Sequence, residues 1–599
     1  MTDKTRTGLE IIVAAALIGV CGNLLLRQMP WGLNASLFVT LFVAAMVAIS
    51  YRHRRELLTV RSLCLQGAMV FFASMYLFRD SVELRVYDTI AIIVLMGVLV
   101  LPNFGINQRF AGIFHYAAGF IWSGLNSLFA PFVLLGADVD WKSMPGNRLS
   151  KGVFSVLRGL AIALPLVLLF GALFMAADAA YENFANRVIN FDLETVMSHV
   201  FLTSLFAWLS AGYFRSTLIE QFAKAAPAVV SPIPKAEEAK PETKPDPEAK
   251  VADDGASFVD KFTAEPAEDT PFAKNANVVE HINTSDSPDE NGKAKVEGDG
   301  SGQSTPEQKK RDWQNWDNTK FPSVFTLGAV ETVLILGLLD VLFLSFVIFQ
   351  LPYLFGGMEF VQNTPDLKLA DFARRGFGEL VAVSFLALPL LLASHWLLRR
   401  DNTKNETLFR VLAGVQIGLL FVIMASAMQR LVLLTGDLGY GWTTVRFYPM
   451  VFMIWLAVVF VWFGWTVLRG HRNNFAWGAL WSAILMLAAT NLMNPDDFIA
   501  RKNIQLMQQG RDFDPYYNAQ LSDDAFPALI EGLPSMSTID QCEVKSTMHY
   551  RYRRLGQMTD IRSFSFPNRA AFLLMRENDA TMHETADCPS HLQNDADGY

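Results

Sequence analysis

Long apolar runs alternate with short polar loops along most of this 599-residue chain. The runs are about 16 to 25 residues long, the length that a helix rising 1.5 Å per residue needs to cross a bilayer core. This pattern predicts an all-α polytopic membrane protein. The expected spans are residues 9–26, 34–50, 63–78, 84–101, 159–177, 196–214, 325–349, 377–398, 409–426, 447–468 and 477–493.

One further apolar segment, residues 111–135, decides how many times the chain crosses the membrane. It carries His115, Asn126 and Pro131 and is rich in glycine and aromatic residues. Lys and Arg are enriched in cytoplasmic loops, and the basic loops here are residues 51–61, 142–158, 399–404 and 469–474. All four share one side only if residues 111–135 are re-entrant or interfacial. This gives eleven crossings, with the N-terminus cytoplasmic and the C-terminus outside; the alternative is that one basic loop breaks the rule.

Two polar segments divide the chain into regions. Residues 223–318 are rich in Pro, Glu, Lys, Asp and Ala. Such a segment buries too little apolar surface to offset its ordering entropy, so we expect a disordered linker. It joins an N-terminal membrane half of about six helices, residues 1–222, to a C-terminal half of about five, residues 319–493. Residues 494–599 are expected to form a small, mostly helical soluble domain, with helical patterns at 521–533 and 562–578.

Composition supports the membrane class: 52% of the residues are hydrophobic and only 18% are charged. The net charge of −8 does not suggest a nucleic-acid partner. Cys542 and Cys588 lie in the polar C-terminal region and can form a disulfide if that region faces an oxidising compartment. No zinc-binding spacing, phosphate-binding loop or catalytic motif is present in the sequence, so we expect no cofactor or metal and favour a non-enzymatic protein.

The stretch "DFARRGFGEL", residues 371–380, places charges at the start of an expected membrane helix. Arg375 and Glu379 are four residues apart, so they share a helix face and can pair. Together with Arg374 they form either a structural ion-pair cluster or a binding site for a carboxylate or phosphate group.

Other charged residues fall on the same outer side in the predicted topology. Pairing among them would lower their cost at membrane depth, and they form either a network that locks the helices to the outer domain or a ligand site. The set is Arg374, Arg375, Glu379, Asp340, Arg430, Asp437, Arg446, Asp496, Asp497 and Arg501. Asp340 lies inside the span 325–349, where an ionisable side chain is expensive and indicates either a functional site or a buried hydrogen bond.

Three motifs of the C-terminal half carry a family resemblance: "FARRGFGEL" (372–380), "YGWTTVRFY" (440–448) and "NPDDFIARKNI" (494–504). They resemble motifs of an uncharacterised family of bacterial polytopic membrane proteins, of the DUF4173 or DUF4153 type. The stretch "LFMAADAAYENFANRVINF" (173–191) shares the likeness. The resemblance implies a multi-pass membrane protein and brings no established reaction with it.

Taken together, these features favour a non-catalytic protein of the bacterial inner membrane that senses, scaffolds or regulates. Its partners would be the lipid bilayer and envelope proteins that contact the C-terminal domain. The alternative is a transporter of a polar or anionic solute that uses Asp340 and the arginine cluster.

Overall fold

The computed structural model describes residues 3–140, 193–219, 326–355, 377–399, 403–436, 441–557, 560–578 and 588. The chain divides into two compact units, Met1–Ala223 with Lys310–Tyr599 and, separately, Lys224–Lys309. The second unit, with most of the expected linker, lies outside the described residues. All the structural features below belong to the first unit.

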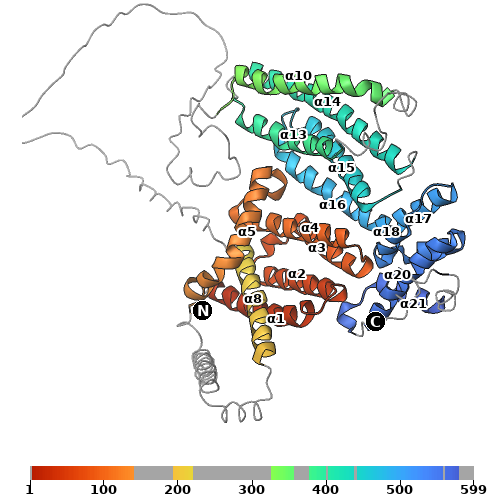
Figure 1. Cartoon of the computed structure of the whole chain (residues 1–599). Coiled ribbons are helices and arrows are strands. Elements are labelled where there is room, and N and C mark those ends of the chain that lie inside the picture. Colours follow the sequence, from red (N-terminus) through yellow and green to blue (C-terminus); the bar gives the residue numbers. More distant parts are fainter. Residues whose placement is uncertain are drawn as a thin grey trace, which may run out of the picture. The chain divides into compact units, whose positions relative to one another are not determined.

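The described part of the first unit is helical (Figure 1). In the N-terminal half the long helices are α1 (Asp3–Leu26), α2 (Leu33–His53), α3 (Val60–Phe78), α4 (Val82–Val100), α5 (Ile113–Val133) and α8 (Leu193–Leu218). In the C-terminal half they are α10 (Ala329–Phe355), α13 (Phe377–Leu397), α14 (Thr403–Thr435), α15 (Thr444–Thr466) and α16 (Phe475–Met493). Within the described ranges, eleven helices are long and apolar enough to cross a membrane. The all-α polytopic prediction is therefore confirmed.

Helix ends follow local chemistry. The side chain of Thr59 accepts a hydrogen bond from the backbone N–H of Ser62 at 3.2 Å and so caps the start of α3. Asn494 adopts a left-handed conformation, with φ 57°, and ends α16. Pro495 then begins the next helix, because proline fits the first turn of a helix, where its missing N–H is not needed.

The ends of the long helices form two opposite faces. The face at which α1 begins and α8 ends is called here the N-face. Near the start of α1, Lys4 pairs with Asp138 at 2.7 Å, and Arg215 near the end of α8 pairs with the same carboxylate at 2.5 Å. The C-terminal half reaches this face too. Leu398 and His471 line a cavity of about 550 Å³ together with His115 and other residues of both halves.

The opposite face is called the C-face. Here the loop between α3 and α4 meets the end of α16, where Arg79 donates a hydrogen bond to the carbonyl of Asn491 at 2.6 Å. The loop between α1 and α2 also lies on this face. Its Leu33 donates a backbone hydrogen bond to the carbonyl of Phe564 at 2.9 Å.

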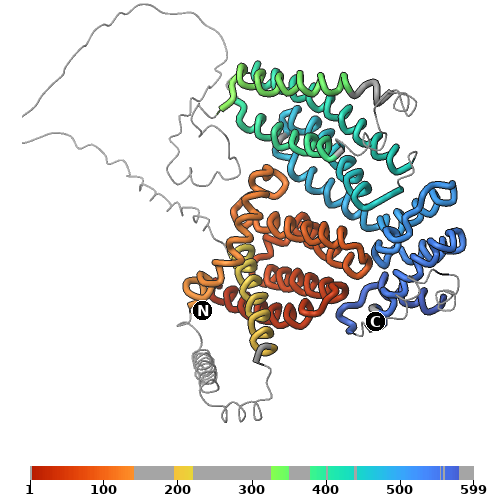
Figure 2. The backbone as a smooth tube through the Cα atoms, viewed as in Figure 1, coloured from red at the N-terminus to blue at the C-terminus, as the bar shows by residue number. Residues whose placement is uncertain are grey.

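Helix α5 crosses α4 instead of running along it (Figure 2). Three glycines mark the crossings, because a Cβ atom at Gly97 of α4, Gly212 of α8 or Gly8 of α1 would collide with α5 or the turn that follows it. Each of these glycines lies within about two turns of the N-face end of its helix. Helix α5 therefore lies along the N-face, as predicted for residues 111–135, although its length and composition would allow a crossing.

The remaining ten candidate spans coincide with ten of the predicted ones. The eleventh predicted span, residues 159–177, lies outside the described residues. Helix α5 ends on the N-face, and α8 begins on the C-face, where His199 contacts Asn23 near the end of α1.

After α16 the described part of the chain forms five α-helices, which are called here the C-terminal helices. They are α17 (Pro495–Gln508), α18 (Pro515–Gln520), α19 (Phe526–Gly532), α20 (Thr538–Gln557) and α21 (Phe566–Glu577). A buried apolar cluster with Ile499, Phe526 and Met548 holds them together, and it also takes in Phe447 of α15 and Leu84 of α4. Cys542 and Cys588 are joined by a disulfide. The C-terminal helices thus share a core with the C-face ends of both membrane halves.

Candidate functional site

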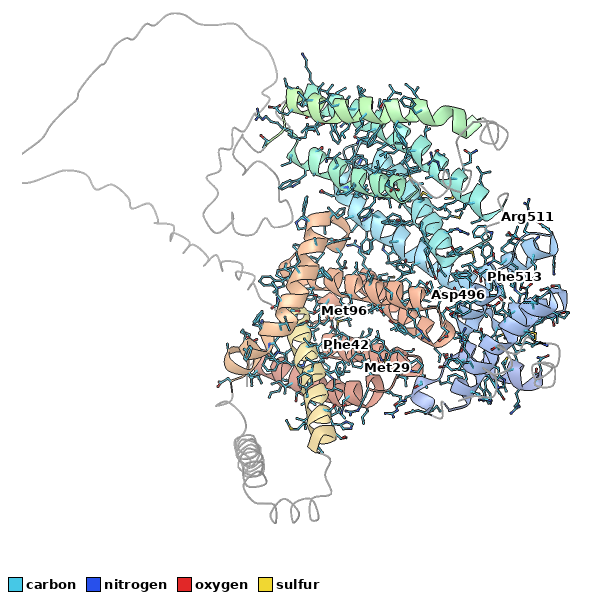
Figure 3. All side chains as sticks on the ribbon, viewed as in Figure 1. Met29, Phe42, Met96, Asp496, Arg511 and Phe513 are labelled. Carbon is cyan, nitrogen blue, oxygen red and sulfur yellow. A yellow bond between two sulfur atoms is a disulfide. The ribbon has the colours of Figure 1, made fainter. Side chains whose placement is uncertain are left out.

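The C-face holds a cluster of four carboxylates, three of them buried and Asp80 partly buried, where α3 and α4 meet the C-terminal helices. It is called here the acidic junction and consists of Asp80, Asp496, Asp523 and Asp524 with Arg79. Asp80 and Arg79 form the short loop after α3, Asp496 opens α17, and the other two carboxylates precede α19. Figure 3 labels Asp496 beside the C-terminal helices.

Backbone and side-chain hydrogen bonds cross the junction in both directions. The backbone N–H of Asp80 donates to the carboxylate of Asp524 at 2.6 Å. The backbone N–H of Asp523 donates to the carboxylate of Asp80 at 3.4 Å. These bonds make the two loops complementary, because each supplies an acceptor for a donor of the other.

Cations balance part of this negative charge. Arg79 approaches Asp524 at 3.5 Å, and Arg85 pairs with Asp80 at 2.8 Å. Arg551 of α20 pairs with Asp523 and also donates to the carbonyl of Ala519 at 3.1 Å. The side-chain amide of Asn568 donates to Asp523 from α21. The junction therefore draws partners from α4, α20 and α21.

Two carboxylates of the junction are shielded from water strongly enough to alter their titration. Burial raises the pKa of Asp524 to about 7, and the nearby Asp80 and Asp496 add to the increase against the opposing effects of the Asp80 N–H and Arg79. Burial also raises the pKa of Asp496, although a hydrogen bond from the Ser522 N–H at 3.1 Å favours the ionised form. The junction can thus change its charge near neutral pH.

A second buried polar contact lies deeper, between the two membrane halves. The Asn491 side-chain amide of α16 donates to the carboxylate of Asp88 of α4 at 2.9 Å. Asp88 is 1% exposed and Asn491 is fully buried, so neither can exchange this bond for one with water. The Ser81 and Tyr448 hydroxyls lie 3.3 Å apart nearby and join α4 to α15. These contacts tie the N-terminal half to the C-terminal half.

The C-terminal helices also hold the loop between α14 and α15. Asn503 accepts a hydrogen bond from the Trp442 N–H at 2.6 Å and donates to the Trp442 carbonyl at 2.9 Å. The Tyr517 hydroxyl accepts a hydrogen bond from the Thr444 N–H at 2.8 Å. The C-terminal helices therefore bind loops from both membrane halves.

The predicted charged network is only partly described. Arg374, Arg375 and Asp437 lie outside the described residues, and so does the expected pair of Arg375 with Glu379. Glu379 is exposed in the first turn of α13. Asp496 is the predicted residue that the structure places in the acidic junction.

The other predicted residues lie apart from the junction. Arg501 pairs with Asp497 at 2.9 Å and with Glu531 at 2.6 Å on the surface of the C-terminal helices. Arg446, in the first turn of α15, donates to the carbonyl of Gly441 in the loop just before that helix. Arg430 is buried in the last turns of α14, and Asp340 is buried in the middle of α10.

Sequence reasoning missed most of the acidic junction. Arg79 and Asp80 lie in the five-residue gap between the predicted spans 63–78 and 84–101, and charged residues in such a gap are typical of a solvated loop. A useful signal was present in the next turn, because Glu83, Arg85 and Asp88 follow at the start of a membrane helix, where charges are expensive without partners. The described residues contain no group of three or more His, Cys, Asp or Glu side chains arranged to hold a metal ion.

One comparison with known proteins identifies a family. The chain matches the family model described as "Domain of unknown function (DUF4153)" over residues 66–242 and 304–532. No curated protein and no solved structure matches the chain. The matched residues include α4, α15, α16 and the loops of the acidic junction, and they make up more than half of the sequence. The chain therefore belongs to the DUF4153 family.

Proposed function

We propose that this protein is a non-catalytic membrane scaffold whose C-terminal helices present a binding surface to envelope proteins. The observation that carries the proposal is the double attachment of these helices. They bind the loop after α3 through Asp524 and the loop before α15 through Asn503 and Tyr517. A partner bound to them would therefore be coupled to both membrane halves.

Two observations support an orientation with the N-face in the cytoplasm of a bacterial inner membrane. The described basic loops all lie on the N-face, and they carry Arg52, Arg54, Arg55, Arg61, Arg399 and Arg469. The disulfide between Cys542 and Cys588 lies on the opposite side, where it suits an oxidising compartment such as the periplasm.

The exposed face of α20 is the surface that we assign to a partner. Ile539 is 64% exposed and Tyr550 is 69% exposed. They are eleven residues apart, so at about 100° per residue they lie on the same side of the helix. Large apolar side chains on one exposed face outside the bilayer are typical of a protein-binding surface.

Photo-crosslinking in intact cells tests this role. A photoreactive phenylalanine analogue at Tyr550 is expected to capture a defined protein, and Ile539→Asp is expected to abolish that product. The matched control is the same analogue at Tyr51, an exposed tyrosine on the N-face, which should not capture that protein. Capture at Tyr550 that is unaffected by Ile539→Asp would contradict the proposed surface.

Solute transport is the second candidate, and one observation favours it. Asp340 is a buried carboxylate in the middle of the candidate span Ala329–Phe349. An ionisable side chain at that depth is a functional feature in many membrane proteins.

A further inference from the structure

Asp340 lies on the buried stripe of α10. The buried side chains of this helix are Thr332, Leu336, Asp340 and Val347, which recur at helical spacing. Helix α10 packs against α14, so this stripe faces α14 inside the membrane. Asp340 is only 7% exposed, and neither of its carboxylate oxygens has a hydrogen-bond partner among the described residues.

Helix α14 also carries a buried polar side chain that has no hydrogen-bond partner among the described residues. Gln416 is fully buried, and neither its amide nitrogen nor its amide oxygen has a hydrogen-bond partner in the described part of the chain. Buried polar atoms are almost always hydrogen-bonded, so each such exception requires an explanation. Here two exceptions occur on two helices that pack together.

The two side chains lie at nearly the same depth. Helices α10 and α14 both begin on the N-face, where the Arg399 N–H donates to the carbonyl of Leu327 at 2.8 Å and the Asn405 amide donates to the carbonyl of Arg399 at 3.1 Å. Asp340 comes eleven residues after Ala329 and Gln416 thirteen residues after Thr403. At 1.5 Å per residue these positions are about 17 and about 20 Å along their helices, which is within one turn.

Helix α13 adds a buried hydroxyl at this depth. It runs antiparallel to α14 and ends on the N-face at Leu397. Ser384 comes thirteen residues before that end, which places it about 20 Å from the N-face. Ser384 is 1% exposed, and its hydroxyl donates to the carbonyl of Leu380 at 2.9 Å, so the oxygen keeps lone pairs that can accept a further partner.

Buried apolar side chains lie beside Asp340 and Gln416 along their helices. Leu336, Ala413, Ile417 and Leu420 belong to one buried cluster in the C-terminal half. An ionised carboxylate in such surroundings is costly unless a positive charge compensates it. The side chains named here supply oxygen ligands and no cation of their own.

We propose that Asp340, Gln416 and Ser384 form an intramembrane binding site for one small monovalent cation. Carboxylate, amide and hydroxyl oxygens are the ligands that hard cations prefer. One carboxylate balances one positive charge, so the filled site is neutral and suits the interior of a bilayer. The site does not depend on the scaffold role proposed above, and cation binding does not by itself require transport.

Thermal unfolding of the full chain in lipid nanodiscs tests the site. A ligand that binds the folded state raises the melting temperature as its concentration rises. Sodium chloride and potassium chloride are compared with choline chloride at equal ionic strength. We expect at least one of the two alkali cations to stabilise the wild-type chain saturably relative to choline.

The variants separate the site from general salt effects. Asp340→Asn is expected to remove the difference between the alkali cation and choline, and Gln416→Leu to raise the concentration for half-maximal stabilisation at least tenfold. Glu331→Gln is the matched control, because it makes the same change at an exposed position of the same helix and should leave the response unchanged. A wild-type response in Asp340→Asn would overturn the proposal, and so would a wild-type chain that responds to pH and to neither alkali cation. If Asp340→Asn does not fold, a wild-type midpoint in Gln416→Leu overturns it.

Discussion

The backbone N–H of Asp80 donates a hydrogen bond to the carboxylate of Asp524 at 2.6 Å, although the two residues are 444 positions apart in the sequence. Asp80 belongs to the loop between two membrane helices, and Asp524 precedes a helix of the C-terminal segment. This contact fixes the C-terminal helices to the N-terminal membrane half. It also places a carboxylate with an elevated pKa where the two parts meet.

The stability of this attachment should depend on pH. Because the folded-state pKa of Asp524 is about 7, above its ordinary value of 3.8, the folded chain holds this proton more tightly than the unfolded chain. The resulting stabilisation is complete below the ordinary value and is lost as the pH rises through 7, with an upper bound on the order of 4 kcal/mol. We expect the melting temperature to fall between pH 5 and pH 8 and Asp524→Asn to flatten that slope. The pH series of both proteins checks this, and an equal slope in the two would rule out Asp524 as the titrating group.

Arg79 should contribute more to the attachment than Arg501. Arg79 caps the end of α16 through the carbonyl of Asn491 and lies beside Asp524, so Arg79→Ala leaves buried acceptors unpaired. We expect it to cost about 1–3 kcal/mol in local stability, seen as faster amide hydrogen exchange in α18 and α19.

Arg501→Ala is the control for Arg79. Arg501 pairs with Asp497 and Glu531 on the surface, where ion pairs contribute at most about 1 kcal/mol. Equal exchange rates in the two variants would contradict the role assigned to Arg79.

The pair of Asp88 and Asn491 should respond differently to changes on its two sides. Asn491→Ala removes the amide and leaves the buried carboxylate of Asp88 without this donor, so we expect a loss of about 2–4 kcal/mol. Asp88→Asn keeps a side chain of the same shape that can accept the same bond and removes the buried charge, so its cost should be smaller. Melting temperatures of the two variants in the same detergent check this order. A larger loss in Asp88→Asn than in Asn491→Ala would contradict the claim that the buried Asp88 carboxylate depends on the hydrogen bond from Asn491.

The hydrophobic pattern alone was sufficient to predict most of the membrane helices. The predicted span 34–50 corresponds to α2, and the predicted span 477–493 to α16, with ends that differ by a few residues. The distribution of Lys and Arg in distant loops also predicted that residues 111–135, which form α5, do not cross the membrane. These features are local, or they depend on counting charges, so they can be read from one sequence.

The acidic junction could not be predicted in the same way. Asp80 and Asp524 are each typical of polar loop residues, and their burial depends on how the C-terminal helices pack on the membrane half. Residues 494–504 form a family-like motif, but the pattern does not indicate that α17 buries Asp496 beside another carboxylate. Asn568 lies in the first turn of α21 and donates to Asp523, a contact that depends on how α21 packs against the segment before α19.

The disulfide should stabilise the C-terminal helices. Cys542 and Cys588 are 46 residues apart in the sequence, and the entropy that the unfolded chain loses when a loop of that length is closed corresponds to about 4 kcal/mol of stabilisation at 25 °C. We expect Cys542→Ser to make α20 and α21 more sensitive to limited proteolysis. Cys64→Ser is the control, because Cys64 is a free cysteine in a membrane helix. Similar digestion of both variants would show that the disulfide does not stabilise this region.

The central claim, that the C-terminal helices are docked on the loop after α3, is tested most directly by a disulfide crosslink in native membranes. Phe78 at the end of α3 and Phe566 at the start of α21 stack with ring centroids 5.0 Å apart, and both side chains are about half exposed. The test chain carries Phe78→Cys and Phe566→Cys, serine at the two free cysteines, and a specific protease site within residues 223–318. Pairing Phe566→Cys with Tyr51→Cys on the N-face gives the control.

After mild oxidation and cleavage, the docked arrangement predicts that the two fragments of the Phe78–Phe566 chain stay joined until a reductant is added. The control fragments should separate without reductant. Separation of the Phe78–Phe566 fragments before reduction would contradict the attachment of the C-terminal helices to the N-terminal membrane half.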